Sequence, residues 1–103
     1  MKNIIDKLDK KDLLTIEKID LLFDNFKHFL KEKNKRYGDS ALKPVKIFTK
    51  QNAGSQICNR LDDKISRIHN STELKKNNIS DMLGYTALLM IENGWLDFNE
   101  LLD

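Results

Sequence analysis

The sequence contains little cysteine, proline or glycine. Cys58 is the single cysteine among 103 residues, so no disulfide can form within the chain, and a reducing compartment fits this usage. Pro44 is the single proline, and there are only four glycines. Long stretches are therefore free of helix breakers. These scarcities favour a domain of long helices over a small scaffold held together by disulfides.

The chain also lacks a strong net charge and a long apolar run. Its 18 basic and 16 acidic residues leave a net charge of +2, too weak a field for non-specific nucleic-acid binding. The longest apolar run, 82–91, is interrupted and is shorter than the roughly 20 residues of a membrane span. Residues 1–11 are charged and have no signal-peptide core. We therefore expect a cytoplasmic protein that binds neither membranes nor nucleic acid non-specifically.

The first helix is expected over about residues 12–35, where apolar residues recur every three or four positions. Asp12 is the expected N-cap, and Gly38 marks the stop. Basic residues near the end suit the negative end of the helix dipole. The apolar stripe consists of Ile16, Ile19, Leu22, Phe23, Phe26, Phe29 and Leu30, and its phenylalanines are expected to lie in the core.

Two more helices are expected in the second half. One starts after an N-cap at Ser55 and ends near 69–70, with Ile57, Leu61, Ile65 and Ile68 as its buried stripe. The other covers about 77–93 and ends at Gly94.

The third helix is apolar nearly all round, which is typical of a helix that is central in its domain or shared with another subunit. The tail, 95–103, is short enough for one or two helical turns. The sequence thus predicts a single all-α domain over 1–103. Three main helices and short terminal helical turns would form a bundle, completed by a homodimer or higher homo-oligomer.

A connection of roughly twenty residues, 36–55, separates the first two helices. Loops this long are uncommon in a small domain and are usually functional. Residues 45–48 fit a short strand or a helical turn. A lone strand has no partner, so we expect no sheet.

Charged residues of the second helix gather at one edge of its apolar stripe. Arg60, Asp63, Lys64 and Arg67 fall within a sector about 100° wide. Three cations and one carboxylate there suit phosphate or another anion, because arginine binds phosphate through two parallel hydrogen bonds and lysine adds a point charge. The alternative is an exposed face with ordinary ion pairs along the helix.

Asp81 and Tyr85 lie four apart on the third helix. A carboxylate on an otherwise apolar helix needs a partner, because burying it alone is costly. Asp81 would pair with Arg60, Lys64 or Arg67 as a structural bridge. Alternatively it would bind a metal or a ligand hydroxyl, with Tyr85 stacking or donating a hydrogen bond.

The turn after the first helix reads Tyr37-Gly38-Asp39-Ser40. Tyr37 could stack on a base, while Gly38 frees the backbone and Ser40 with nearby amides could meet a phosphate. The alternative is an ordinary helix-ending turn.

Other residues point to packing. Cys58 is expected to be a small core residue, and Trp95 a packing cap. His28 and His69 are too far apart in sequence to suggest a metal pair.

Three segments of the chain resemble a phage and bacterial all-α family known as nucleotide-modification-associated domains. They are Asn34 to Ser40, Arg60 to Ile68 and Asp81 to Tyr85, in the family's order. The resemblance covers more than half of the chain, 33–91.

More distantly, the layout is similar to the MazG-type all-α nucleotide pyrophosphohydrolases, which hold Mg²⁺ through acidic pairs on two helices. That resemblance implies Asp62, Asp63 and Asp81 as metal ligands. Asn77 and Asn78 stand where an acid is expected, so the metal site is depleted, and the resemblance leaves catalysis open.

Together the basic sector and the family resemblance imply a phage-type protein that binds a phosphorylated nucleotide or a cyclic-nucleotide signal in a basic pocket. It would sequester that signal in the host cytoplasm to counter host defence. One alternative is a Mg²⁺-dependent, MazG-like nucleotide pyrophosphohydrolase, and another is a helical protein that inhibits a host enzyme. The predicted ligand-binding residues are Tyr37, Gly38, Ser40, Arg60, Asp63, Lys64, Arg67, Asp81 and Tyr85.

Overall fold

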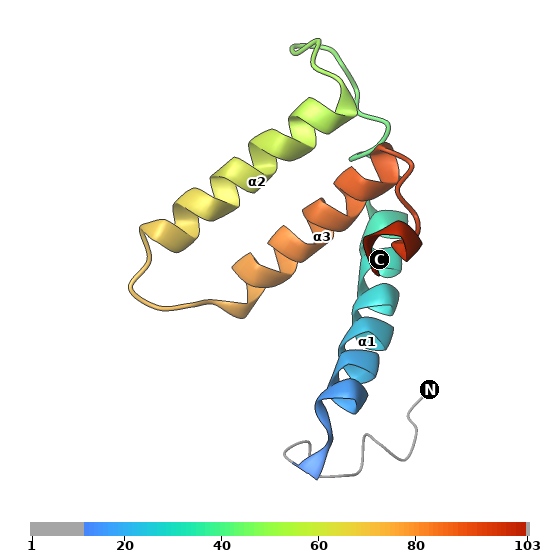
Figure 1. Cartoon of the computed structure of the whole chain (residues 1–103). Helices are drawn as coiled ribbons and strands as arrows, with labels where there is room; N and C mark the ends of the chain where they lie inside the picture. Colours follow the sequence, from blue (N-terminus) through green and yellow to red (C-terminus); the bar gives the residue numbers. More distant parts are fainter. Residues whose placement is uncertain (1–11, 103) are drawn as a thin grey trace. The chain divides into compact units, whose positions relative to one another are not determined.

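The computed structural model describes residues 12–102, and the regular secondary structure in this part of the chain is helical. It contains α1 (Thr15–Arg36), α2 (Ala53–His69), α3 (Lys76–Glu92) and a 3-10 turn, η3 (Asn99–Leu102) (Figure 1). No strand occurs between residues 12 and 102. The all-α prediction is confirmed, whereas completion by oligomerisation remains a prediction. No helix within this range is long and apolar enough to cross a membrane.

The chain divides into two compact units, one up to Arg36 and one from Tyr37 onward. The first unit contains α1, and the second contains α2, α3 and η3. Each unit is described by itself below.

Helix α1 starts at Thr15, three residues later than the predicted cap at Asp12. The Leu14 backbone N–H donates to Glu17 Oε1 at 2.9 Å. This is the reciprocal half of a capping box, in which an acid in the first turn reaches back to the residue before the helix. Leu14, rather than Asp12, therefore lies at the N-cap position, because Glu17 accepts the hydrogen bond of the Leu14 N–H.

The apolar stripe of α1 is not a core. None of the residues from Thr15 to Arg36 is buried, and Phe23 and Phe29 are 53% and 43% exposed. The periodicity correctly predicted one apolar face, but the assignment of its phenylalanines to the core was wrong. Spacing tells which residues share a face and says nothing of what covers it.

Helix α1 ends at Arg36, and a turn follows. The Ser40 N–H donates to the Tyr37 carbonyl at 3.2 Å, and Gly38 and Asp39 have φ angles of 60° and 61°. Glycine adopts this left-handed region readily, which explains the stop predicted at Gly38.

The segment 43–52 has no regular secondary structure. Val45, Ile47 and Phe48 are exposed and form neither a strand nor a helical turn. The predicted long connection exists and ends at Asn52.

Helix α2 begins at Ala53, with Asn52 rather than Ser55 as its N-cap. Asn52 Oδ1 accepts a hydrogen bond from the Ser55 N–H at 2.8 Å. The predicted cap is wrong because Asn52 lies three residues upstream, where its side chain satisfies the free N–H groups of the first turn. The predicted end is confirmed, since α2 ends at His69 with Asn70 as its C-cap.

Helix α3 ends as its sequence predicts. Gly94 has a φ of 74°, and its N–H donates to the Ile91 carbonyl at 3.0 Å. The Trp95 N–H donates to the Met90 carbonyl at 2.9 Å. These two bonds make a Schellman motif, which satisfies carbonyls that would otherwise be left free at the helix end.

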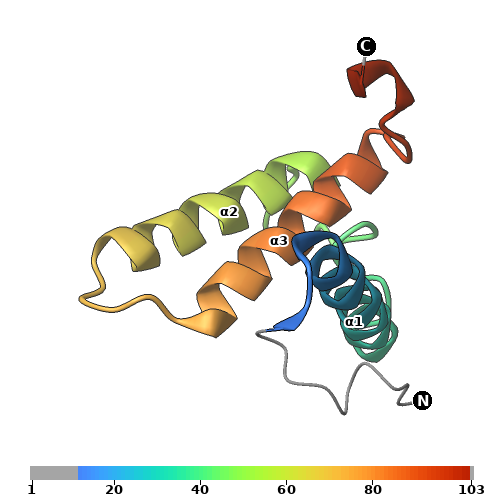
Figure 2. The same cartoon turned by 60° about the horizontal axis from the view of Figure 1, so that its bottom comes forward.

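Helices α2 and α3 run antiparallel and pack side by side (Figures 1 and 2). A Cβ placed on Gly54, at the start of α2, would lie 4.0 Å from Glu92 Cγ at the end of α3. Ala53, Ile57, Asn78 and Gly84 are buried, and Ile57 is the deepest at 1% exposed. We call this pair the α2–α3 hairpin.

Three packing predictions in the second unit are wrong. Cys58 is exposed rather than in the core, because it lies one residue, or about 100° of helix rotation, from the buried Ile57. Trp95 is also more exposed than a packing cap would be, and Ile65 of the predicted α2 stripe is half-exposed.

Candidate functional site

Two of the charged residues predicted to form the site, Lys64 and Asp81, meet where α2 packs against α3. Lys64 Nζ lies 3.0 Å from Asp81 Oδ2, and these side chains are only 13% and 24% exposed. Each helix thus brings one charge to a partly buried position, where neither charge would be stable without a partner. Of the partners that the sequence left open for Asp81, the structure shows Lys64.

One helical turn away, Arg60 of α2 lies over Tyr85 of α3. The Arg60 Cζ is 5.9 Å from the centre of the Tyr85 ring, within range of a cation–π interaction. Four residues separate Arg60 from Lys64, and four separate Asp81 from Tyr85, so the two contacts follow from one antiparallel register. These four residues are the α2–α3 seam.

Asp63 and Arg67 pair with one another along α2. Arg67 Nε lies 3.2 Å from Asp63 Oδ2, and both side chains are more than half exposed. Packing against α3 therefore divides the predicted sector of four charges. Arg60 and Lys64 face α3, while Asp63 and Arg67 form an ion pair along α2.

The charge balance of this region differs from that of an open basic pocket. Lys64 and Arg67 each face a carboxylate. Arg60 is exposed and takes part in no ion pair with another residue between 12 and 102. Arg60 is therefore the cation of the sector that can bind an incoming anion without first breaking an ion pair with a carboxylate.

The turn predicted to contact a ligand is built by its own hydrogen bonds. The Leu42 and Lys43 N–H groups donate to the Asp39 carbonyl, and Lys43 Nζ lies 3.7 Å from Asp39 Oδ2. Tyr37 is 65% exposed, so its ring is accessible. The backbone bonds of Ser40 stay within the turn, and no hydrogen bond or ion pair joins Tyr37, Gly38 or Ser40 to the seam.

The three predicted metal ligands do not converge. Asp63 faces Arg67, Asp81 faces Lys64, and Asp62 is exposed. In the described part of the chain, no three His, Cys, Asp or Glu side chains gather closely enough to hold a metal ion. Mg²⁺ needs several oxygen ligands, and these positions do not provide such a group.

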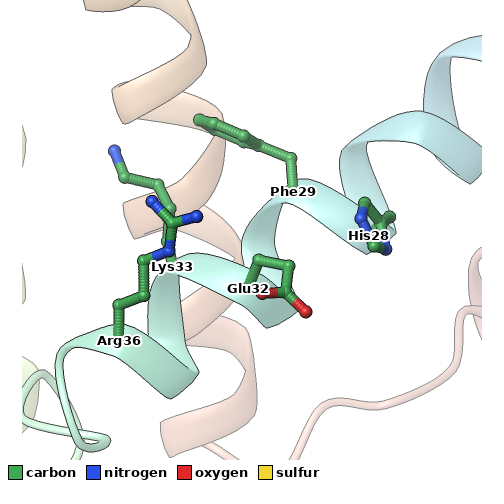
Figure 3. A pocket seen from close by; sticks show the side chains of 5 residues that line it. All are labelled: His28, Phe29, Glu32, Lys33 and Arg36. Atoms are coloured by element: carbon green, nitrogen blue, oxygen red, sulfur yellow. The ribbon is translucent and has the colours of Figure 1, made fainter.

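A second candidate site, which the sequence analysis missed, lies on α1. His28, Phe29, Glu32, Lys33 and Arg36 line a hollow of about 250 Å³. Figure 3 shows Lys33 and Arg36 extending to the same side, and Lys33 Nζ lies 5.1 Å from the centre of the Phe29 ring. The signal was present as i, i+4 spacing, but the basic residues were interpreted only as partners of the helix dipole.

No family model matches the chain, and no curated protein and no solved structure shows significant similarity to it.

Proposed function

We propose that the chain binds a phosphorylated nucleotide-like ligand at the Arg60 end of the α2–α3 seam. The supporting observation is that Arg60 lies over the Tyr85 ring and, among residues 12–102, pairs with no carboxylate. A guanidinium held by an aromatic face loses less freedom when it binds two phosphate oxygens.

In this proposal Lys64 and Asp81 position the site rather than bind the phosphate. Their contact fixes the register of α2 on α3, and this register places Arg60 opposite Tyr85. Asp81 would accept a hydrogen bond from a ligand hydroxyl. The exposed turn residues Tyr37 and Ser40 would be secondary contacts.

The wider role in the proposal rests on the family resemblance. A phage-encoded protein in the host cytoplasm would sequester a cyclic or phosphorylated nucleotide signal and so counter host defence. The oligomeric state predicted from the sequence belongs to the same proposal.

Calorimetry with a panel of nucleoside phosphates and cyclic nucleotides tests the proposal. We expect at least one of them to bind. Arg60→Gln should then weaken binding by about tenfold or more, the range for losing a charge-assisted bidentate contact. Tyr85→Leu should weaken it less, because it frees the guanidinium without removing it.

Arg67→Gln is the matched control, since it removes the same charge from the solvent-facing pair with Asp63. It should leave the affinity within about twofold, as expected for an exposed charge in physiological salt. If a sample with a helical circular dichroism spectrum binds no nucleotide, the proposal is wrong. Equal losses in both arginine variants would also contradict it, because they would indicate non-specific attraction.

A further inference from the structure

Helix α1 carries a coiled-coil pattern that the candidate site does not use. Five apolar residues alternate in steps of three and four, which is the a and d spacing of a heptad. Two more, Leu22 and Phe29, lie beside them at g positions. The a and d residues are Ile16, Ile19, Phe23, Phe26 and Leu30. All seven positions lie on a helix with no buried residue.

The exposed stripe is large enough to bind a partner. Ile16, Ile19, Leu22, Phe23 and Phe29 are each between 43% and 72% exposed. Together they present on the order of 500 Å² of apolar surface, the upper range for a patch on a monomer. Two such stripes placed together would bury about 1,000 Å², near the lower limit of a specific interface.

The charges of α1 are divided between its two halves. Residues 15–25 contain three carboxylates and one cation, whereas residues 26–36 contain five cations and one carboxylate. The helix is therefore acidic at its start and basic at its end. A second copy laid antiparallel would bring each acidic half against a basic half.

We propose that α1 pairs antiparallel with α1 of a second copy of this chain. In the matching register, Phe23 of each copy meets Phe26 of the other at the twofold axis. Ile19 of each copy meets Leu30 of the other on either side. Leu22 and Phe29 then face one another across the g positions and widen the apolar seam.

The flanking charges fit this orientation. At the e positions, Asp20 of one copy faces Lys27 of the other, and symmetry repeats the pair. A parallel pairing would set acidic half on acidic half and basic on basic. It would also place the apolar Leu22 beside the charged Lys27. The antiparallel orientation is thus the one that both the charges and the apolar layers favour.

Light scattering on the full chain gives the first test. We expect twice the 12.0 kDa chain mass at tens of micromolar. Phe23→Ala should raise the dissociation constant by about tenfold or more, as for a central aromatic anchor. Phe98→Ala is the matched control, because Phe98 is equally exposed at 53% but lies outside α1. It should leave the dimer unchanged.

Charge reversal tests the orientation. Asp20→Lys and Lys27→Asp each turn both e-position pairs into like-charge pairs and should each weaken self-association by about fivefold or more. Mixed together, the two variants should form a heterodimer, because each chain then supplies the charge that the other lacks. The matched controls are Asp24→Lys and Lys31→Asp, which make the same charge changes at b positions away from the seam.

The pairing of α1 can be tested separately from nucleotide binding, since neither Arg60 nor Tyr85 takes part. A folded wild-type chain that stays monomeric would overturn it, whether the stripe is then covered by the chain itself or by a different protein. A dimer unaffected by Phe23→Ala would also overturn it. If Asp20→Lys and Lys27→Asp fail to form a heterodimer, or if Asp24→Lys and Lys31→Asp lose as much self-association as the e-position variants do, the antiparallel orientation is wrong.

Discussion

Helix α1 and helix α2 of the hairpin are both amphipathic, yet they use their apolar residues differently. The hairpin buries Ala53 and Ile57 and sets Lys64 against Asp81 within its own unit. Helix α1 is the longest helix, at 22 residues, and buries no residue. An apolar stripe therefore shows that a helix has a face suited to burial, but the stripe alone does not identify what buries it.

The two regions also differ in how their polar groups are used. In the hairpin, the interhelical pair Lys64–Asp81 and the Arg60–Tyr85 contact both depend on one register. Partly buried pairs of this kind specify an arrangement more than they add stability. The charges of α1 are instead divided along one helix, with an acidic first half over residues 15–25 and a basic second half over residues 26–36.

The largest expected effect compares the same substitution in the two regions. Ile57→Ala removes a side chain that is 1% exposed and should lower the free energy of unfolding by about 2–4 kcal/mol. Ile19→Ala removes one that is half-exposed and should cost under about 1 kcal/mol in a monomer. Urea unfolding followed by circular dichroism, at a concentration where light scattering gives a monomer, measures both. Equal losses would mean that the monomer buries the α1 stripe after all.

A smaller effect is expected from the two ion pairs of α2. Lys64→Met leaves Asp81 partly buried without its lysine and should cost about 1–3 kcal/mol. Arg67→Met breaks a pair that is more than half exposed and should cost no more than about 0.5 kcal/mol. Thermal unfolding of the two variants gives the comparison. Similar losses would show that the Lys64–Asp81 pair contributes no more to stability than the solvent-facing Arg67–Asp63 pair.

Much of the helical layout follows from the sequence. The scarcity of proline and glycine and the three- and four-residue spacings predicted the three helices. Gly94 and Asn70 marked two helix ends correctly, because positive φ at a glycine and polar C-caps are local properties. The starts were less predictable. Asp12 and Ser55 were plausible caps, but Glu17 and Asn52 make the hydrogen bonds that define the observed starts.

The sequence predicted which residues belong to the charged sector of α2 but not which of them contact α3. A helical wheel put Arg60, Asp63, Lys64 and Arg67 in one sector. Which of them contacts α3 depends on the rotation of α2 and on its register along α3, and packing sets both. The same rotation buries Ile57 and exposes Cys58. A carboxylate at Asp81 on an apolar helix pointed to a partner among three cations, and only the register of the two helices selects Lys64.

The smallest expected effect compares the helix starts of the two regions. Asn52→Ala removes the side chain that accepts the Ser55 N–H and should lower the free energy of unfolding by about 1 kcal/mol, because α2 is part of the packed hairpin. Glu17→Ala removes the acceptor of the Leu14 N–H. It should fray the first turn of α1 and change global unfolding by only a few tenths of a kcal/mol, because solvent can replace an exposed partner.

Hydrogen exchange of the Leu14 and Ser55 amides, together with urea unfolding, separates local from global loss. In Glu17→Ala the Leu14 amide should exchange faster while the urea midpoint stays nearly constant. In Asn52→Ala both should change together. A large fall in the midpoint for Glu17→Ala would contradict the comparison, because it would mean that the start of α1 unfolds with the hairpin and not apart from it.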